Sequence, residues 1–191
     1  MKTPDDSCPA RRRLLAAGAA SVSLGLLPPR PVLALPARPR GATRRLVFEN
    51  LHTGESLSTI YWEQGRYLPQ ALRELEHLLR DFRTGTAHAI APGLLDLLCA
   101  LRLHSGSTRP IQLISGYRSP ATNAALRARS HGVAPLSLHM RGMAADIRIP
   151  GLPLERLHAI ALSLRAGGVG FYPRSNFVHV DVGAVRRWVG A

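Results

Sequence analysis

Residues 137–146 have the sequence SLHMRGMAAD, which places His139 seven residues before Asp146 with small residues between them. A second histidine, His179, follows in the segment NFVHVD at 176–181. Two imidazoles and one carboxylate are enough protein ligands for a catalytic zinc ion, with the fourth position left for water. This stretch is compatible with a metal site, and the flanking segments indicate how the ligands would meet. The residues alone leave two alternatives open, in which Asp146 is a buried partner of an arginine and His179 is a core histidine with satisfied hydrogen bonds.

Short apolar segments on both sides of this stretch predict β-strands at 110–114, 144–149, 169–172 and 177–182. Alternate side chains of a strand share a face, so His179 and Asp181 should point the same way while the neighbouring valines enter the core. Asp146 begins a neighbouring strand and His139 enters from the loop before it. The pattern thus predicts that both histidines and Asp146 converge on one point.

The other periodic segments predict helices that pack on this sheet. Apolar residues at helical spacing or helix-start prolines favour helices at 68–82, 92–103, 120–129 and 153–166, and two further strands are expected at 45–50 and 56–62. We find no internal repeat. The sequence predicts a single α+β domain at 45–191, with helices packed on a small, mainly antiparallel sheet.

The N-terminal segment resembles an export signal. Arg11, Arg12 and Arg13 precede an apolar run that continues through Leu27, and small residues favour cleavage after Ala34. The arginines followed by leucines resemble the twin-arginine signal of bacteria. We therefore expect a signal peptide at 1–34, a linker at 35–44, passage through the twin-arginine export machinery, and a periplasmic protein without a stable membrane span after processing.

The chain is strongly basic, with 25 Lys+Arg against 12 Asp+Glu and a formal net charge of +13. Cleavage after Ala34 would leave about +10. A basic surface attracts polyanions, and for an exported protein these would be cell-wall polymers. No nucleic-acid-binding motif is present, so nucleic acid is not expected as a partner. Cys99, in an apolar helical segment, should be a buried thiol without a catalytic role.

The spacing Ser-x-His-x-x-Gly-x-Ala-x-Asp at 137–146, the segment SGYRS at 115–119 and the late strand histidine together resemble the D-Ala-D-Ala metallopeptidase superfamily, which includes lysostaphin-like and hedgehog-type zinc domains. More narrowly, the chain is similar to the MepK (YcbK) murein endopeptidases. The shared stretches are 50–55, 112–119, 165–172 and 176–181, and the resemblance covers nearly all of residues 45–188.

The resemblance implies a Zn²⁺ ion held by His139, Asp146 and His179, with water as the fourth ligand. It also implies that Arg118 polarises the scissile carbonyl or steadies the developing oxyanion. Ser137 and Tyr117 would contact the substrate, or Ser137 would orient His139. The implied substrates are the stem peptides and cross-links of peptidoglycan, cut at bonds to meso-diaminopimelate during wall remodelling.

One position departs from the superfamily pattern. Many members have a carboxylate three residues before the last zinc histidine, and here that residue is Asn176. We expect Asp181 to serve as the general base instead, and the alternative is that it orients a ligand histidine. Asn176 also leaves open a non-catalytic, peptidoglycan-binding zinc domain. The many arginines leave open a carboxypeptidase that releases terminal D-Ala.

Overall fold

The computed structural model describes residues 43–129 and 133–190, which belong to one compact unit, Arg38–Ala191. The expected signal peptide at 1–34 and nearly all of the expected linker lie outside these residues. Within the described ranges, no helix combines the length and the apolar character needed to cross a bilayer.

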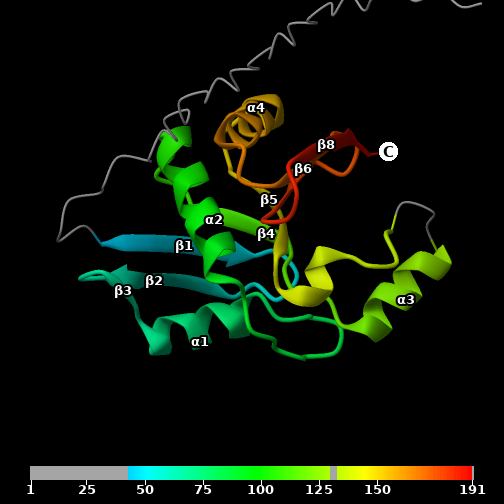
Figure 1. Cartoon of the computed structure of the whole chain (residues 1–191), viewed down its shortest axis with the longest axis horizontal. Helices are drawn as coiled ribbons and strands as arrows, with labels where there is room; N and C mark the ends of the chain where they lie inside the picture. Colours follow the sequence, from blue (N-terminus) through cyan, green and yellow to red (C-terminus); the bar gives the residue numbers. More distant parts are fainter. Residues whose placement is uncertain (1–42, 130–132, 191) are drawn as a thin grey trace, which may run out of the picture. The chain divides into compact units, whose positions relative to one another are not determined.

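One mixed sheet organises the unit (Figure 1). Its strands are β1 (Arg44–Asn50), β2 (Ser56–Glu63), β3 (Arg66–Tyr67), β4 (Ile111–Ser115), β5 (Ala144–Arg148), β6 (Gly168–Tyr172), β7 (Phe177–Asp181) and β8 (Arg186–Val189). They are ordered β3-β2-β1-β4-β5-β7-β6-β8. The pairs β1–β4 and β6–β8 are parallel, and the other neighbours are antiparallel.

The expected α+β class and mainly antiparallel sheet are confirmed, but the sheet is larger than the sequence indicated. Its two edge strands, β3 and β8, were missed. β3 has only two residues, and β8 begins with two arginines and contains little of the β-branched, apolar pattern that marks a strand. β8 forms because it can pair with β6, which is a tertiary effect that local pattern does not contain.

The helices are α1 (Pro69–Leu78), α2 (Pro92–Ser105), α3 (Pro120–Arg129) and α4 (Leu154–Leu164), with a short 3₁₀ helix, η1 (Leu138–Arg141). α1 is shorter than the apolar spacing over 68–82 predicts. Its C-terminal carbonyl at Leu79 accepts the backbone N–H of Tyr117 instead of continuing the helix. Helix α3 has the predicted bounds, and Ser119 accepts the N–H of Thr122 as its N-cap.

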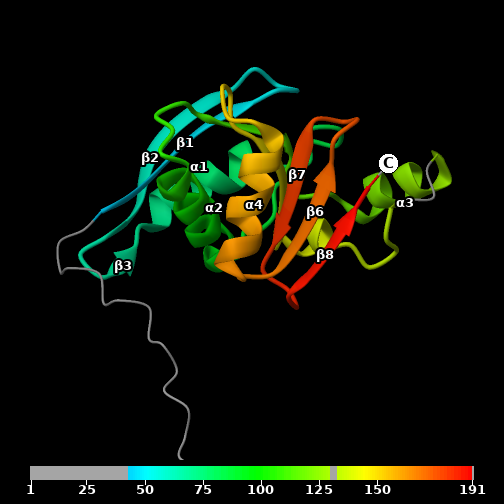
Figure 2. The same cartoon turned by 90° about the horizontal axis from the view of Figure 1, so that it is seen from above.

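Helices α1, α2 and α4 cover the sheet face that carries the core. α1 contacts β2, α2 contacts β1, and α4 contacts β6 and β7, while α2 and α4 lie side by side (Figure 2). On β5 and β7, the buried residues Ala145, Ile147, Val178 and Val180 belong to this core. Asp146, His179 and Asp181 occupy the alternate positions. The two central strands therefore present the candidate site on the face opposite the helix-covered core.

Candidate metal centre

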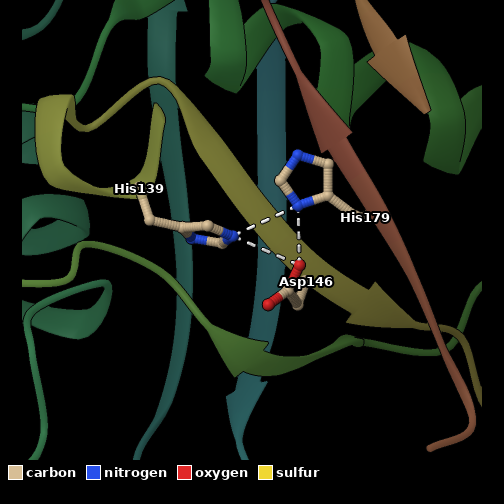
Figure 3. Close-up of side chains that lie close together, drawn as sticks. All are labelled: His139, Asp146 and His179. Atoms are coloured by element: carbon tan, nitrogen blue, oxygen red, sulfur yellow. Dashed lines mark hydrogen bonds and ion pairs between the residues drawn. The ribbon is translucent and has the colours of Figure 1, made fainter. Parts of the chain in front are cut away.

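Three side chains from separate elements meet above β5 and β7 (Figure 3). Nδ1 of His179 lies 2.9 Å from Oδ1 of Asp146, and Nε2 of His139 lies 3.2 Å from Nδ1 of His179 and 3.3 Å from the same carboxylate oxygen. Asp146 and His179 are direct cross-strand partners. Among the residues described, this is the one cluster of His, Cys, Asp or Glu with the spacing of a metal site.

Hydrogen bonds behind the two imidazoles fix which ring nitrogen faces the centre. Nδ1 of His139 lies 2.7 Å from the carbonyl oxygen of Gly116, which can only accept, so this nitrogen carries the proton. Nε2 of His179 likewise donates to Oδ2 of Asp181 at 3.1 Å. In their neutral forms, His139 therefore presents the lone pair of Nε2 and His179 that of Nδ1, as metal-bound histidines do.

Two nitrogen lone pairs and a carboxylate oxygen therefore converge. These three electron-rich atoms repel one another unless a cation lies between them. Their separations of 2.9–3.3 Å match the roughly 3.3 Å expected between tetrahedral ligands at zinc bond lengths of about 2.0–2.1 Å. The residues present therefore fit a divalent metal ion with one position left open.

The pKa values of His179 and Asp146 are shifted by the same attraction between this centre and positive charge. Burial acts to lower the pKa of His179, but hydrogen bonds to Asp146 and Asp181 outweigh it and raise the pKa to about 8. Burial would raise the pKa of Asp146, yet His139 and His179 hold it well below its usual range. Asp146 is accordingly ionised at neutral pH and available as a ligand.

His139 lies on the short helix η1, and Gly142 is the residue that follows this helix. Gly142 has φ +63°, a left-handed conformation that side chains disfavour, and a Cβ there would lie 2.1 Å from the carbonyl oxygen of Ala89. Its own carbonyl accepts the N–H of Ala91 at 2.9 Å. The glycine therefore lets the chain turn sharply from η1 into β5, so that His139 and Asp146 face each other.

The centre opens into a cavity of about 650 Å³. Besides the three candidate ligands, its lining includes Arg118, Ser137, Tyr172, Phe177, Arg186 and Trp188. The side chain of Arg118 is mostly buried, with 12% of it exposed, and its Nη2 lies 3.8 Å from Oδ2 of Asp146. Its backbone N–H donates to the carbonyl of His139. The structure thus places Arg118 and Ser137 in the same cavity lining as the candidate ligands, and their expected roles stay predictions.

One expected site residue, Tyr117, and the departing position Asn176 both lie elsewhere. Tyr117 is buried at the edge of the hydrophobic core, and its ring stacks on the exposed His88 with centroids 4.6 Å apart. It is not among the described residues that line the cavity. The expectation that it contacts substrate is therefore not supported. Asn176 is an exposed turn residue with φ +54° that lies outside the lining of this cavity.

Asp181 is close to the centre but lies behind it. It is fully buried and accepts hydrogen bonds from His179, from the N–H groups of Gly168 and Gly183, and from the guanidinium of Arg186. These hydrogen bonds hold its pKa far below the usual range, although burial acts to raise it. This placement disfavours the expected role as general base and favours the alternative, the orientation of His179.

Sequence reasoning missed Tyr172, Arg186 and Trp188 as cavity residues. Arg186 and Trp188 both belong to β8, which was not predicted, and an i, i+2 pair of a cation and an aromatic would have placed them on one face. Tyr172 ends a predicted strand, but nothing local distinguishes it from a core aromatic. These residues are identified by their position in the cavity.

The model of the family described as peptidoglycan L,D-endopeptidase MepK matches residues 38–188. The chain belongs to this family. It is 47% identical over 178 residues to peptidoglycan L,D-endopeptidase MepK of Escherichia coli K12, covering 93% of this chain and 96% of that protein. It is 41% identical over 181 residues to the probable peptidoglycan L,D-endopeptidase MepK of Haemophilus influenzae, covering 94% and 96%. The family resemblance expected from the sequence is confirmed.

Proposed function

We propose that this protein is a zinc-dependent murein endopeptidase that hydrolyses peptide cross-links of peptidoglycan at bonds to meso-diaminopimelate. Family membership makes the chain a peptidoglycan peptidase, and thus a hydrolase. The observation that carries the metal-dependent part is the convergence of His139, Asp146 and His179, each with a defined ligand atom, at the floor of an open cavity.

When bound there, the metal ion would supply Lewis-acid activation for the attack of water on an amide carbonyl. The chain's own residues would hold and orient the reacting groups. His139 and His179 are locked by Gly116 and Asp181, so their lone pairs keep their direction. Arg118, buried beside Asp146, would donate to the carbonyl oxygen as negative charge develops on it.

We propose the diaminopimelate–diaminopimelate cross-link as the preferred bond. The name of the relatives, L,D-endopeptidase, describes cleavage between an L and a D centre, and this cross-link joins such centres. A D-Ala–diaminopimelate cross-link joins two D centres instead. The basic residues that line the cavity, Arg118 and Arg186, suit a substrate that carries free carboxylates.

Digestion of purified cross-linked muropeptides, with and without a chelator and analysed by mass, tests the proposal. We expect dimers to fall to monomers, zinc to restore activity after chelation, and His139→Ala to release nothing. Intact dimers in the presence of one bound zinc would favour the non-catalytic wall-binding domain. Loss of terminal D-Ala alone would make the protein a carboxypeptidase.

We further propose that residues 1–34 direct the protein through the twin-arginine machinery to the periplasm, where the domain at 45–191 acts after cleavage behind Ala34. Replacement of Arg11, Arg12 and Arg13 by lysine should leave the full-length precursor inside the cell. The mass of the wild-type protein recovered from the periplasm would locate the cleavage site.

A further inference from the structure

Tyr172 is the one ionisable side chain in the cavity lining that the proposed reaction has not used. Among the described residues that line the cavity, His139, Asp146 and His179 form the metal centre, and Arg118 and Arg186 are the cations. Asp181 is enclosed behind His179, so it offers no free oxygen to a substrate. Among these ionisable groups, the hydroxyl of Tyr172 is therefore the one neutral donor without an assigned role.

The hydroxyl is held in place from one side and free on the other. Tyr172 ends β6, and its ring stacks on Phe177 across the hairpin with centroids 4.5 Å apart. Nε1 of Trp188 donates a hydrogen bond to its oxygen at 2.9 Å. An indole N–H can only donate, so the tyrosine oxygen accepts here, and its own O–H remains available to donate to another group.

Trp188 contacts both this hydroxyl and a histidine of the metal centre. Its ring centroid lies 5.1 Å from that of His179. The indole also lies directly over Gly170, where a Cβ would come within 2.7 Å of three ring atoms. The absence of a side chain at Gly170 therefore lets Trp188 pack closely against β6. The N–H of Trp188 in turn fixes the position of the Tyr172 oxygen.

Tyr172 and Arg118 line the same cavity. Burial lowers the pKa of Arg118, while Asp146 and Tyr172 act in the opposite direction. A buried guanidinium and a free hydroxyl donor thus both line the space beside the candidate ligands. Two donors directed at one developing negative charge form the arrangement that stabilises tetrahedral intermediates in acyl transfer.

We propose that Tyr172 is a further catalytic residue, whose hydroxyl donates a hydrogen bond to the oxygen of the scissile carbonyl as its carbon becomes tetrahedral. This role rests on the proposed hydrolysis. Water adds to the carbonyl carbon, the C–N bond breaks, and the water supplies both the new carboxyl oxygen and the proton of the new amine. Tyr172 keeps its proton throughout, and Arg118 shares the oxygen with it.

The test compares Tyr172→Phe with wild type in the metal-loaded, full-length protein, because this change removes the hydroxyl and keeps the stacked ring. We expect kcat on cross-linked dimers to fall by about 10²-fold, with KM and bound metal nearly unchanged. Binding of a phosphinate pseudopeptide, whose tetrahedral phosphorus replaces the scissile carbonyl, should weaken by a similar factor in calorimetry.

Two variants serve as controls. Tyr67→Phe removes a hydroxyl at the opposite edge of the sheet, where it donates to Asp96, and should leave kcat unchanged. Trp188→Phe removes the indole N–H but leaves the Tyr172 hydroxyl, so its loss of kcat should be smaller than that of Tyr172→Phe.

Wild-type kcat and phosphinate affinity retained in Tyr172→Phe, within about threefold, would overturn the role, as would a loss confined to KM or to bound metal. Failure of the wild-type protein itself to cleave dimers would instead reject the proposed function.

Discussion

Oδ2 of Asp181 lies 3.1 Å from Nε2 of His179, on the side of the imidazole away from Nδ1, the atom that approaches Asp146. The carboxylate is fully buried and also holds two backbone N–H groups and Arg186. It therefore fixes the rotation and the tautomer of a candidate ligand, in the manner of carboxylate–histidine–metal arrangements.

Replacement of Asp181 by asparagine should weaken metal binding by about 10–100-fold, because His179 loses the charged carboxylate acceptor that holds its Nδ1 lone pair toward the centre. Competition against a fluorescent chelator measures this affinity. Activity should return largely at saturating metal. Unchanged metal affinity together with a large loss of kcat at saturating metal would instead support the general-base role.

Replacement of Arg118 by alanine should lower kcat/KM by about 10²–10³-fold with little change in bound metal. Its backbone N–H to His139 survives the substitution, so the helix η1 should keep its position. Steady-state kinetics and metal analysis measure the two effects. Arg127→Ala, an exposed charge on α3, provides the matched control, and an equal loss there would point to general electrostatics.

Metal removal should destabilise the wild-type protein, since a bound ion stabilises only the folded state. At an ion concentration about 100-fold above its dissociation constant, the gain is about 2.7 kcal/mol. Thermal unfolding with and without zinc should show this gain in wild type and not in His139→Ala. His104→Ala, an exposed histidine on α2, should respond as wild type does. An undiminished shift in His139→Ala would mean that zinc binds elsewhere.

The stability of the loop that carries Arg118 should depend on Asp81. Burial acts to raise the pKa of Asp81, but hydrogen bonds from Thr122, Ser119 and Arg83 lower it to about 2. A folded-state pKa below the unfolded value of about 3.9 stabilises the protein fully above that value, by about 2 kcal/mol, and the gain is lost as pH falls toward 2.

Urea unfolding of wild type and Asp81→Asn measures this dependence. The variant should be less stable at pH 6, and the difference should shrink as the pH is lowered from 5 toward 2. Glu155→Gln, an exposed carboxylate on α4, is the control and should show a much smaller difference. A pH-independent difference at Asp81 would show that its charge is not responsible.

Much of the candidate site follows from local pattern. The alternation of FVHVD places His179 on the face opposite two core valines, and the apolar segment at 144–149 predicts a strand that carries Asp146. Antiparallel pairing then brings Asp146 and His179 into register, as β5 and β7 do. The positions of these residues could be predicted because period-two alternation and pairing determine them.

The remaining features depend on tertiary contacts that no local pattern records. Tyr117 belongs to the same five-residue segment as Arg118, yet its ring enters the core against His88 while Arg118 lines the cavity. Asp181 shares the face of His179, but only the folding of Gly168 and Arg186 around it reveals that its oxygens are occupied. The shared strand face predicted that Asp181 would lie close to His179. It did not predict whether an oxygen of Asp181 would be free to accept a proton from water.

The two histidines are not interchangeable, because His139 presents Nε2 and His179 presents Nδ1. In the side-chain amides, the polar atoms of asparagine lie close to where Nδ1 would be, and those of glutamine extend to the position of Nε2. Glutamine at 139 and asparagine at 179 are therefore the closest isosteres of the lost donors. Asparagine at 139 with glutamine at 179 would leave both amide oxygens about a bond length from the positions of the lost nitrogens. In naturally varied or engineered sequences, the two positions should therefore tolerate different substitutions.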